Sequence, residues 1–225
     1  MIINVEIINN NAVNDGGGIW GNNSSAYLEN VAVINNSSGS LGGGIHFISS
    51  DPYLLNVTVS GNTSSTQGGG IRFAGNNSTA SLVNVTITGN TSAAGGGIYN
   101  NNLSFPVLVN CILWNNTPQE IYTAGGGEVV ATYSDIQGGW TGEGNINANP
   151  LFCNPNSGDY TLAENSPCLG TGENDANMGA FGAGCGEVFN GPVWHAATTG
   201  SDETGDGTAE NPFATIQKGI DISWN

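Results

Sequence analysis

Lysine, arginine and histidine together number only four in this 225-residue chain, and two of these four side chains stand at equivalent positions. His46 and Arg72 each lie between an isoleucine and a phenylalanine. A lyase that acts on a polysaccharide needs a basic residue to abstract a proton beside a metal-held carboxylate. Trp20 and Tyr99 occupy the matching positions of the segments before and after. The four residues could form a stripe that contacts carbohydrate, or they could be exposed positions that vary because nothing constrains them. We favour the interpretation as unconstrained positions.

The carboxylates do not recur in the pattern that glycoside hydrolysis requires. That reaction needs two carboxyl groups at a defined separation. The few acidic residues near the start of the chain do not share a position of the repeat described below: Glu6, Asp15, Glu29 and Asp51. We therefore expect no catalytic residues and no enzymatic activity. A polysaccharide-binding or polysaccharide-degrading enzyme is the alternative.

A short acidic stretch near the C-terminus is the one candidate for a metal site. Asp202, Glu203 and Asp206 supply the hard oxygen ligands that Ca²⁺ prefers. The stretch lacks the spacing of an EF-hand loop, and a solvated acidic turn is the other interpretation. No other cofactor is expected. No cysteine pair has the spacing of a zinc site.

Two motifs recur with a nearly constant period. Gly-Gly-Gly-Ile ends at Ile19, Ile45, Ile71 and Ile98, and a degenerate copy is Gly125-Gly126-Gly127-Glu128. Asn-Val-x-(Val/Ile) begins at Asn4, Asn30, Asn56 and Asn84, and becomes Asn-Cys-Ile-Leu at Asn110. Steps of about 26 residues indicate one structural unit copied along an axis.

The segments inside each repeat alternate apolar and polar residues, which is typical of half-buried strands. Two or three short strands with their turns fit one coil of a parallel β-solenoid, with coils about 4.8 Å apart. Equivalent residues then stack. We expect an asparagine ladder of Asn10, Asn36, Asn62, Asn90 and Asn116. Corner glycines that need positive φ or close backbone approach are expected at Gly17, Gly43, Gly69 and Gly96.

These features resemble the right-handed parallel β-helix family. The Gly-Gly-Gly-Ile motif and the strands that end in asparagine, such as Val59-Ser60-Gly61-Asn62, are similar to the paired short motifs of polymorphic outer-membrane proteins. The resemblance covers about residues 1–135. It implies an all-β, right-handed parallel β-helix of five to six coils over residues 1–148. Residues 149–190 would form a C-terminal capping module, and residues 191–225 a tail.

The capping module contains three of the four cysteines. Residues 149–181 resemble the terminal module of secreted β-helix proteins, and this resemblance implies a disulfide between Cys153 and Cys185, with Cys168 unpaired. A Cys153–Cys168 bond is the competing possibility. Cys111 replaces a valine of an inward column and is interpreted as a buried small hydrophobe. A disulfide fits an extracellular or cell-surface location.

The tail resembles the opening of a further β-helix domain. Residues 211–217 read Asn-Pro-Phe-Ala-Thr-Ile-Gln, a segment that would precede a capping helix. The chain is then either a slice of a longer tandem protein or a subunit whose tail docks on the uncapped first coil of another copy. The second possibility is strand addition repeated head to tail, which generates a filament. The expected partners are copies of itself or adjacent β-helix domains.

The charge balance excludes several other partners. Two basic residues against 18 acidic residues give a formal net charge of −16, so neither nucleic acid nor an anionic membrane is expected to bind. No signal peptide or membrane-spanning run is present. Possible glycosylation sites are Asn22, Asn23, Asn76, Asn77 and Asn102. The leading hypothesis is a secreted structural or adhesive scaffold, which would bind carbohydrate or a cell-surface ligand.

Overall fold

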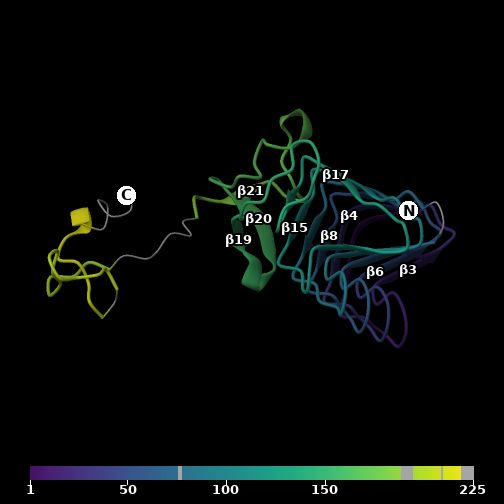
Figure 1. The fold of residues 1–225 in the computed structure, drawn as a ribbon, viewed down its shortest axis with the longest axis horizontal. Helices are drawn as coiled ribbons and strands as arrows, with labels where there is room; N and C mark the ends of the chain where they lie inside the picture. The colour runs from purple at the N-terminus through teal and green to yellow at the C-terminus, as the bar shows by residue number, and fades with distance from the viewer. Residues whose placement is uncertain (76–77, 189–194, 209, 219–225) are drawn as a thin grey trace. The chain divides into compact units, whose positions relative to one another are not determined.

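The computed structural model describes residues 1–75, 78–188, 195–208 and 210–218. The chain divides into two compact units, Met1–Val188 and Phe189–Asn225. The first unit contains a parallel β-solenoid of about 7 turns with about 26 residues per turn. Figure 1 shows the turns as successive parallel rungs from β3 and β4 onwards. The expected all-β parallel solenoid is confirmed, with about 7 turns where five to six coils were expected, and only 4% of the chain is helical.

Three parallel sheets form the walls of the solenoid. The largest sheet contains β1 (Ile2–Ile8), β4 (Tyr27–Ile34), β7 (Tyr53–Leu55), β8 (Thr58–Ser60), β11 (Ser81–Val83), β12 (Thr86–Thr88), β14 (Val107–Val109), β15 (Ile112–Trp114), β17 (Val130–Thr132) and β18 (Asp135–Ile136). The second contains β3 (Ile19–Asn22), β6 (Ile45–Ile48), β10 (Ile71–Ala74), β13 (Ile98–Asn100) and β16 (Ile121–Thr123). The third is short, with β2 (Asn11–Ala12), β5 (Ser37–Ser38) and β9 (Thr63–Ser64).

The core consists of columns of identical or similar apolar side chains. Leu28, Leu54, Leu82 and Leu108 pair in register and are fully buried. Each contributes about 2 kcal/mol through the apolar surface that it removes from water. Phe47 and Phe73 stack with ring centroids 6.5 Å apart. The period of the sequence therefore becomes the period of the core.

Asparagines form a buried ladder along the solenoid. The side-chain Oδ1 of Asn36 accepts hydrogen bonds from both the main-chain N and the Nδ2 of Asn10, each at 2.9 Å. The same double acceptance recurs in the next three steps, to Asn62, Asn90 and Asn116. From Asn36 onwards, each Nδ2 also donates to a main-chain carbonyl of the preceding turn. The ladder satisfies polar groups that the corner would otherwise bury unpaired.

Positive φ and close approach of the backbone both occur at the glycine corners, but at different glycines of each triplet. A Cβ at Gly17, Gly43, Gly69 or Gly96 would lie 2.2 to 2.5 Å from a carbonyl oxygen of a neighbouring turn. Positive φ belongs instead to the preceding glycine in each triplet, as at Gly42 with φ of 62°. A side chain is therefore excluded at the named positions by close approach of the backbone.

The degenerate fifth glycine motif was placed wrongly. Ile121 pairs with Ile98, so the fifth corner is Pro118-Gln119-Glu120-Ile121 and not residues 125–128. Glu120 therefore occupies, one turn further along the solenoid, the position that Gly97 occupies as the third glycine of the preceding triplet. The period shortens here, and triplet matching alone does not detect the shift.

Residues 149–188 pack against the solenoid wall. They contain β19 (Phe152–Asn154), β20 (Asp159–Ala163), β21 (Ala183–Cys185) and two 3₁₀ turns, Pro155–Ser157 and Glu173–Asp175. Phe152, Leu162, Cys168 and Met178 form a second apolar cluster with Ile112 of β15. Figure 1 shows β19 to β21 beside β15.

The second compact unit is a small turn-rich fold around Phe213. The backbone of Phe213 exchanges hydrogen bonds with His195 and Ala197, and its side chain is buried. Asp202 accepts hydrogen bonds from the main-chain N of Ala214 and Thr215. The arrangement orders the segment that was expected to precede a capping helix.

Replacement of a central ladder residue is expected to destabilise the solenoid strongly. Asn62→Ala leaves two donors of Asn36, the carbonyl of Val33 and the Oδ1 of Asn90 without this partner. Because an unsatisfied buried polar group costs about 1–3 kcal/mol, we expect a loss of roughly 4 kcal/mol in urea unfolding. Thr63→Ala, at the adjacent exposed position, should cost less than about 0.5 kcal/mol. Equal losses in the two variants would contradict a structural role for the ladder.

Candidate functional site

The column of Trp20, His46, Arg72 and Tyr99 exists, but it is not the exposed stripe that the sequence suggested. The four residues pair in register across β3, β6, β10 and β13, and Tyr122 of β16 continues the column. His46, Arg72 and Tyr99 are 0%, 8% and 6% exposed, and only Trp20 is open to solvent at 54%. Outward side chains stacked at strand spacing cover one another, which explains the burial.

The two basic residues of this column, His46 and Arg72, bind each other and neighbouring side chains. The guanidinium Nη1 of Arg72 lies 2.6 Å from Nε2 of His46, and its Nε donates to Gln67 Oε1 at 3.1 Å. The Arg72 guanidinium also lies 5.8 Å from the centre of the Tyr99 ring, a cation–π contact. Burial and the charge of Arg72 lower the pKa of His46 to about 4. A neutral His46 therefore accepts a hydrogen bond from Arg72, and neither residue reaches solvent as a base.

Two buried carboxylates escaped the sequence analysis. Glu120 ends the asparagine ladder: its carboxylate accepts hydrogen bonds from the main-chain N and the Nδ2 of Asn116. Asp135 accepts from the main-chain N of Ala148, and its Oδ2 lies 3.2 Å from the Cys168 thiol. Burial is the largest effect on both, and it raises the pKa of Glu120 to about 7 and that of Asp135 to about 6. The replacement of the third corner glycine by Glu120 at the fifth corner was the available signal for this residue.

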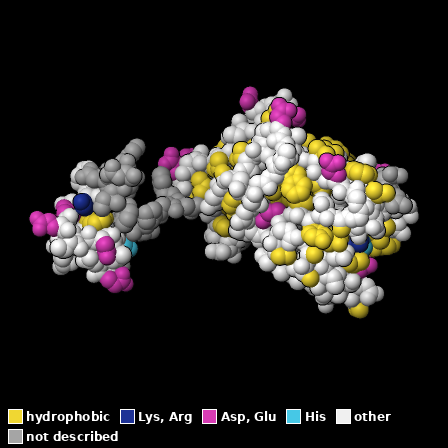
Figure 2. Space-filling view, in the orientation of Figure 1, with side chains coloured by type: hydrophobic (Ala, Val, Ile, Leu, Met, Phe, Trp, Pro, Cys, Tyr) yellow, Lys and Arg dark blue, Asp and Glu magenta, His cyan; other side chains and the backbone are white. Residues whose placement is uncertain are grey.

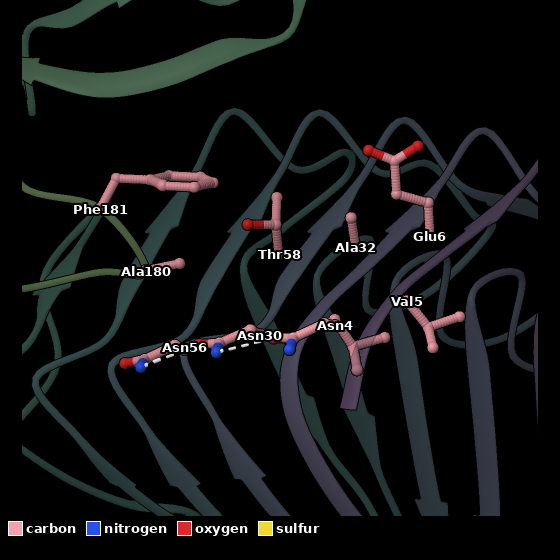
Figure 3. A pocket seen from close by; sticks show the side chains of 10 residues that line it. Asn4, Val5, Glu6, Asn30, Ala32, Asn56, Thr58, Ala180 and Phe181 are labelled. Atoms are coloured by element: carbon pink, nitrogen blue, oxygen red, sulfur yellow. Dashed lines mark hydrogen bonds between the residues drawn. The ribbon is translucent and has the colours of Figure 1, made fainter. Parts of the chain in front are cut away.

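One open groove lies on the largest sheet of the solenoid and has a volume of about 500 Å³. Its floor is the outward column Glu6, Ala32 and Thr58, one residue from each of the first three turns. Asn4, Asn30 and Asn56 form one side, and Ala180 and Phe181 close one end. Figure 3 shows these side chains in two parallel rows. None of these residues was predicted as a site, although the Asn-Val-x-Val motif marked one row.

A second asparagine ladder forms that row. The Nδ2 of Asn30 donates to Oδ1 of Asn4 at 3.0 Å, and Asn56 and Asn84 continue the series at 3.2 Å. All of these residues have positive φ, a conformation that asparagine tolerates better than most residues. In contrast to the buried ladder, Asn4 and Asn30 are exposed, so their amides face the groove.

The cysteines follow the expected pattern. Cys153 and Cys185 form a disulfide with a Cα–Cα distance of 5.9 Å, and Cys111 and Cys168 are free and buried. Burial raises the pKa of the Cys111 thiol to about 12 and raises that of Cys168 as well. Protonated, buried thiols are poor nucleophiles, so neither is a reactive site.

The acidic residues of the tail are used within the chain. Asp202 accepts hydrogen bonds from residues 214 and 215, and Asp206 accepts from the main chain and hydroxyl of Thr208. These hydrogen bonds lower the pKa of both groups. Among the described residues, no three His, Cys, Asp or Glu side chains gather closely enough to hold a metal ion. Asp202, Glu203 and Asp206, named above as possible calcium ligands, therefore receive no support as a cluster.

The possible glycosylation sites divide into two groups. Asn22, Asn23 and Asn102 are exposed and remain available for modification. Asn76 and Asn77 lie outside the described residues. Asn36, Asn62 and Asn90 of the buried ladder also begin Asn-x-Ser/Thr sequences, but their burial excludes glycosylation.

Replacement of Arg72 is expected to raise the pKa of His46. In Arg72→Met the positive charge is lost while burial remains, so the pKa should move up from about 4 but stay below 6.5. NMR titration of the imidazole carbons measures this shift, and a His195→Gln background assigns the single remaining signal. Lys218→Met, which removes the other basic side chain, should leave His46 unchanged. An unaltered His46 pKa in Arg72→Met would show that the pair is not coupled.

Glu120→Gln is expected to reduce the dependence of stability on pH. Because the folded protein holds the Glu120 proton more tightly than the unfolded chain, this stabilisation is complete below pH 4.5 and is lost as the pH rises through about 7. The pKa difference corresponds to on the order of 3 kcal/mol. The glutamine Oε1 can accept both Asn116 donors, as each ladder Oδ1 does.

Thermal midpoints at pH 4 and pH 8 test this expectation. The variant should match the parent near pH 4 and exceed it at pH 8, while Asp135 retains part of the pH dependence in both proteins. Glu128→Gln, at an exposed neighbouring position, should behave as the parent. A variant less stable than the parent at pH 8 would contradict the burial of an unfavourable charge.

Comparison with protein-family models, with curated proteins and with solved structures gave no match. Function is therefore inferred from the contacts described above.

Proposed function

We propose that this chain is a non-catalytic extracellular scaffold, structural or adhesive, whose solenoid presents a long, regular surface. The observation that carries the proposal is the use of its basic and acidic groups inside the structure. His46 and Arg72 bind each other, and Glu120 ends the ladder. Groups that are buried against one another in the wall and at the end of the ladder are not available to a substrate.

The construction of the solenoid favours a mechanical role. Each turn contacts its neighbours through continuous backbone pairing, core columns and two asparagine ladders, so a local load is shared along the axis. Stacked rings add to this, as between Tyr27 and Tyr53 at 5.6 Å and between Tyr99 and Tyr122 at 5.1 Å. A rod held in this way suits display or spacing of a binding surface.

The surface and the disulfide support an extracellular setting. The Cys153–Cys185 bond fits an oxidising compartment. In the described part of the chain, no helix is long and apolar enough to cross a membrane. Acidic side chains are scattered over the visible face, and basic ones are few (Figure 2). A net charge of −16 favours solubility and disfavours phosphate-bearing partners.

A scaffold should not turn over polysaccharides. We expect no new reducing ends and no unsaturated uronate absorbance when the purified chain is incubated with neutral and acidic polysaccharides, with and without Ca²⁺. The variants His46→Gln and Arg72→Met should give the same blank result. Turnover by the parent that is lost in Arg72→Met would replace the scaffold proposal with a lyase centred on this column.

A further inference from the structure

The groove over the first three turns is the open part of a longer track on the largest sheet. The floor column Glu6, Ala32 and Thr58 continues to Thr86 and Ile112. Over those last two residues the track is occupied by the chain itself. Thr86 Oγ1 accepts a hydrogen bond from the main-chain N of Ala180 at 2.9 Å. The occupied half therefore ends at Phe181, where the open half begins.

The chemistry of the open half fits a hydroxyl-rich ligand. In this second ladder, the Nδ2 groups of Asn30 and Asn56 each use one hydrogen for the neighbouring amide, and each Oδ1 has a second lone pair, so the row offers donors and acceptors in alternation. These amides repeat at the strand spacing of about 4.8 Å. That interval is close to the length of one pyranose ring in an extended polysaccharide. Thr58 and Glu6 add a hydroxyl and a carboxylate along the same floor.

An aromatic ring closes the groove where a sugar ring would contact it. Phe181 is 41% exposed although it is a large apolar side chain. Figure 3 shows its ring beside the row that contains Thr58 and Ala32. The apolar face of a pyranose packs on such a ring, while its hydroxyls reach the amides. The groove therefore combines one aromatic contact with a polar row, within a volume that holds a few sugar residues.

Charge decides between neutral and acidic glycans. The groove contains Glu6 and no basic residue. Arg72 is the one basic residue of the solenoid, and it is buried in a different sheet against His46. A polyuronate would meet repulsion from Glu6 and from the net charge of −16, without a compensating cation.

We propose that the groove formed by Asn4, Asn30, Asn56, Glu6, Ala32 and Thr58 and closed by Phe181 binds a segment of a neutral polysaccharide that lies along the solenoid axis. This proposal goes beyond the scaffold function and does not depend on the absence of catalysis. The ligand is bound through amide hydrogen bonds and one ring contact.

Affinity gel electrophoresis of the 225-residue chain tests the proposal. The gels contain a neutral polymer, such as laminarin, galactomannan, xyloglucan or arabinoxylan, and polygalacturonate serves as the acidic comparison. We expect retardation by at least one neutral polymer and none by polygalacturonate. Titration calorimetry with a hexasaccharide of the polymer that binds then gives the affinity of each variant.

Two variants act on the groove in different ways. Phe181→Ala removes the ring contact and should weaken binding about fivefold. Ala32→Trp fills the floor with a side chain that points away from the core, and should weaken binding more than twentyfold. Trp20→Ala, which removes an exposed aromatic residue from another sheet, should bind as the parent does. Circular dichroism and thermal midpoints establish that each variant is folded.

Several outcomes would overturn the proposal. These are no retardation by any neutral polymer, tighter binding of polygalacturonate, and affinities unchanged in both Phe181→Ala and Ala32→Trp. Selection of an extended peptide that competes at the groove, without glycan binding, would assign the groove to a protein partner instead. Each of these outcomes leaves the scaffold function standing, because that function fails only if polysaccharide is cleaved.

Discussion

The buried asparagine ladder is the interaction on which the rest of the structure depends. A solenoid corner brings main-chain groups into the interior, where a lost hydrogen bond costs more than in water. Each ladder Oδ1 meets this demand by accepting both the main-chain N and the side-chain Nδ2 of the turn before it. The requirement fixes asparagine at one position in each of the first five turns, since aspartate lacks the donor and glutamine is one carbon longer. It therefore fixes the register of the strands on either side.

Every hydrogen bond of the ladder runs from a donor in one turn to the Oδ1 of the next turn. The last asparagine therefore needs a different acceptor, and this need determines the structure of the last regular corner. Asn116 has no asparagine in the following turn to accept its two donors, and Glu120 accepts them from within the same corner. The two hydrogen bonds favour the carboxylate, yet burial has the larger effect and raises its pKa. The stability of the solenoid is thus coupled to pH at the point where the repeat ends.

The repetitive part of the fold was predictable because each position recurs in several turns. The period of about 26 residues and the alternation of apolar and polar residues were enough to predict the apolar columns, the asparagine ladder and the glycine corners. The exposure of the Trp20 column was not predictable, because burial there comes from contact between outward side chains of adjacent turns. The groove also escaped prediction, since Phe181 lies far along the chain from Glu6 and reaches the same face only when residues 172–181 fold back on the wall.

The burial of Arg72 has a consequence for how this protein would be degraded. Proteases of the trypsin class cleave only after lysine or arginine, and the chain offers two such residues, Arg72 and Lys218. Arg72 lies between His46 and Tyr99 in the wall of the solenoid, so cleavage there requires a turn to open first. In the folded chain a protease of this class is therefore expected to cleave only after Lys218, which leaves residues 1–218 intact. The burial of Arg72 thus protects the one site within the solenoid at which such a protease is able to cut.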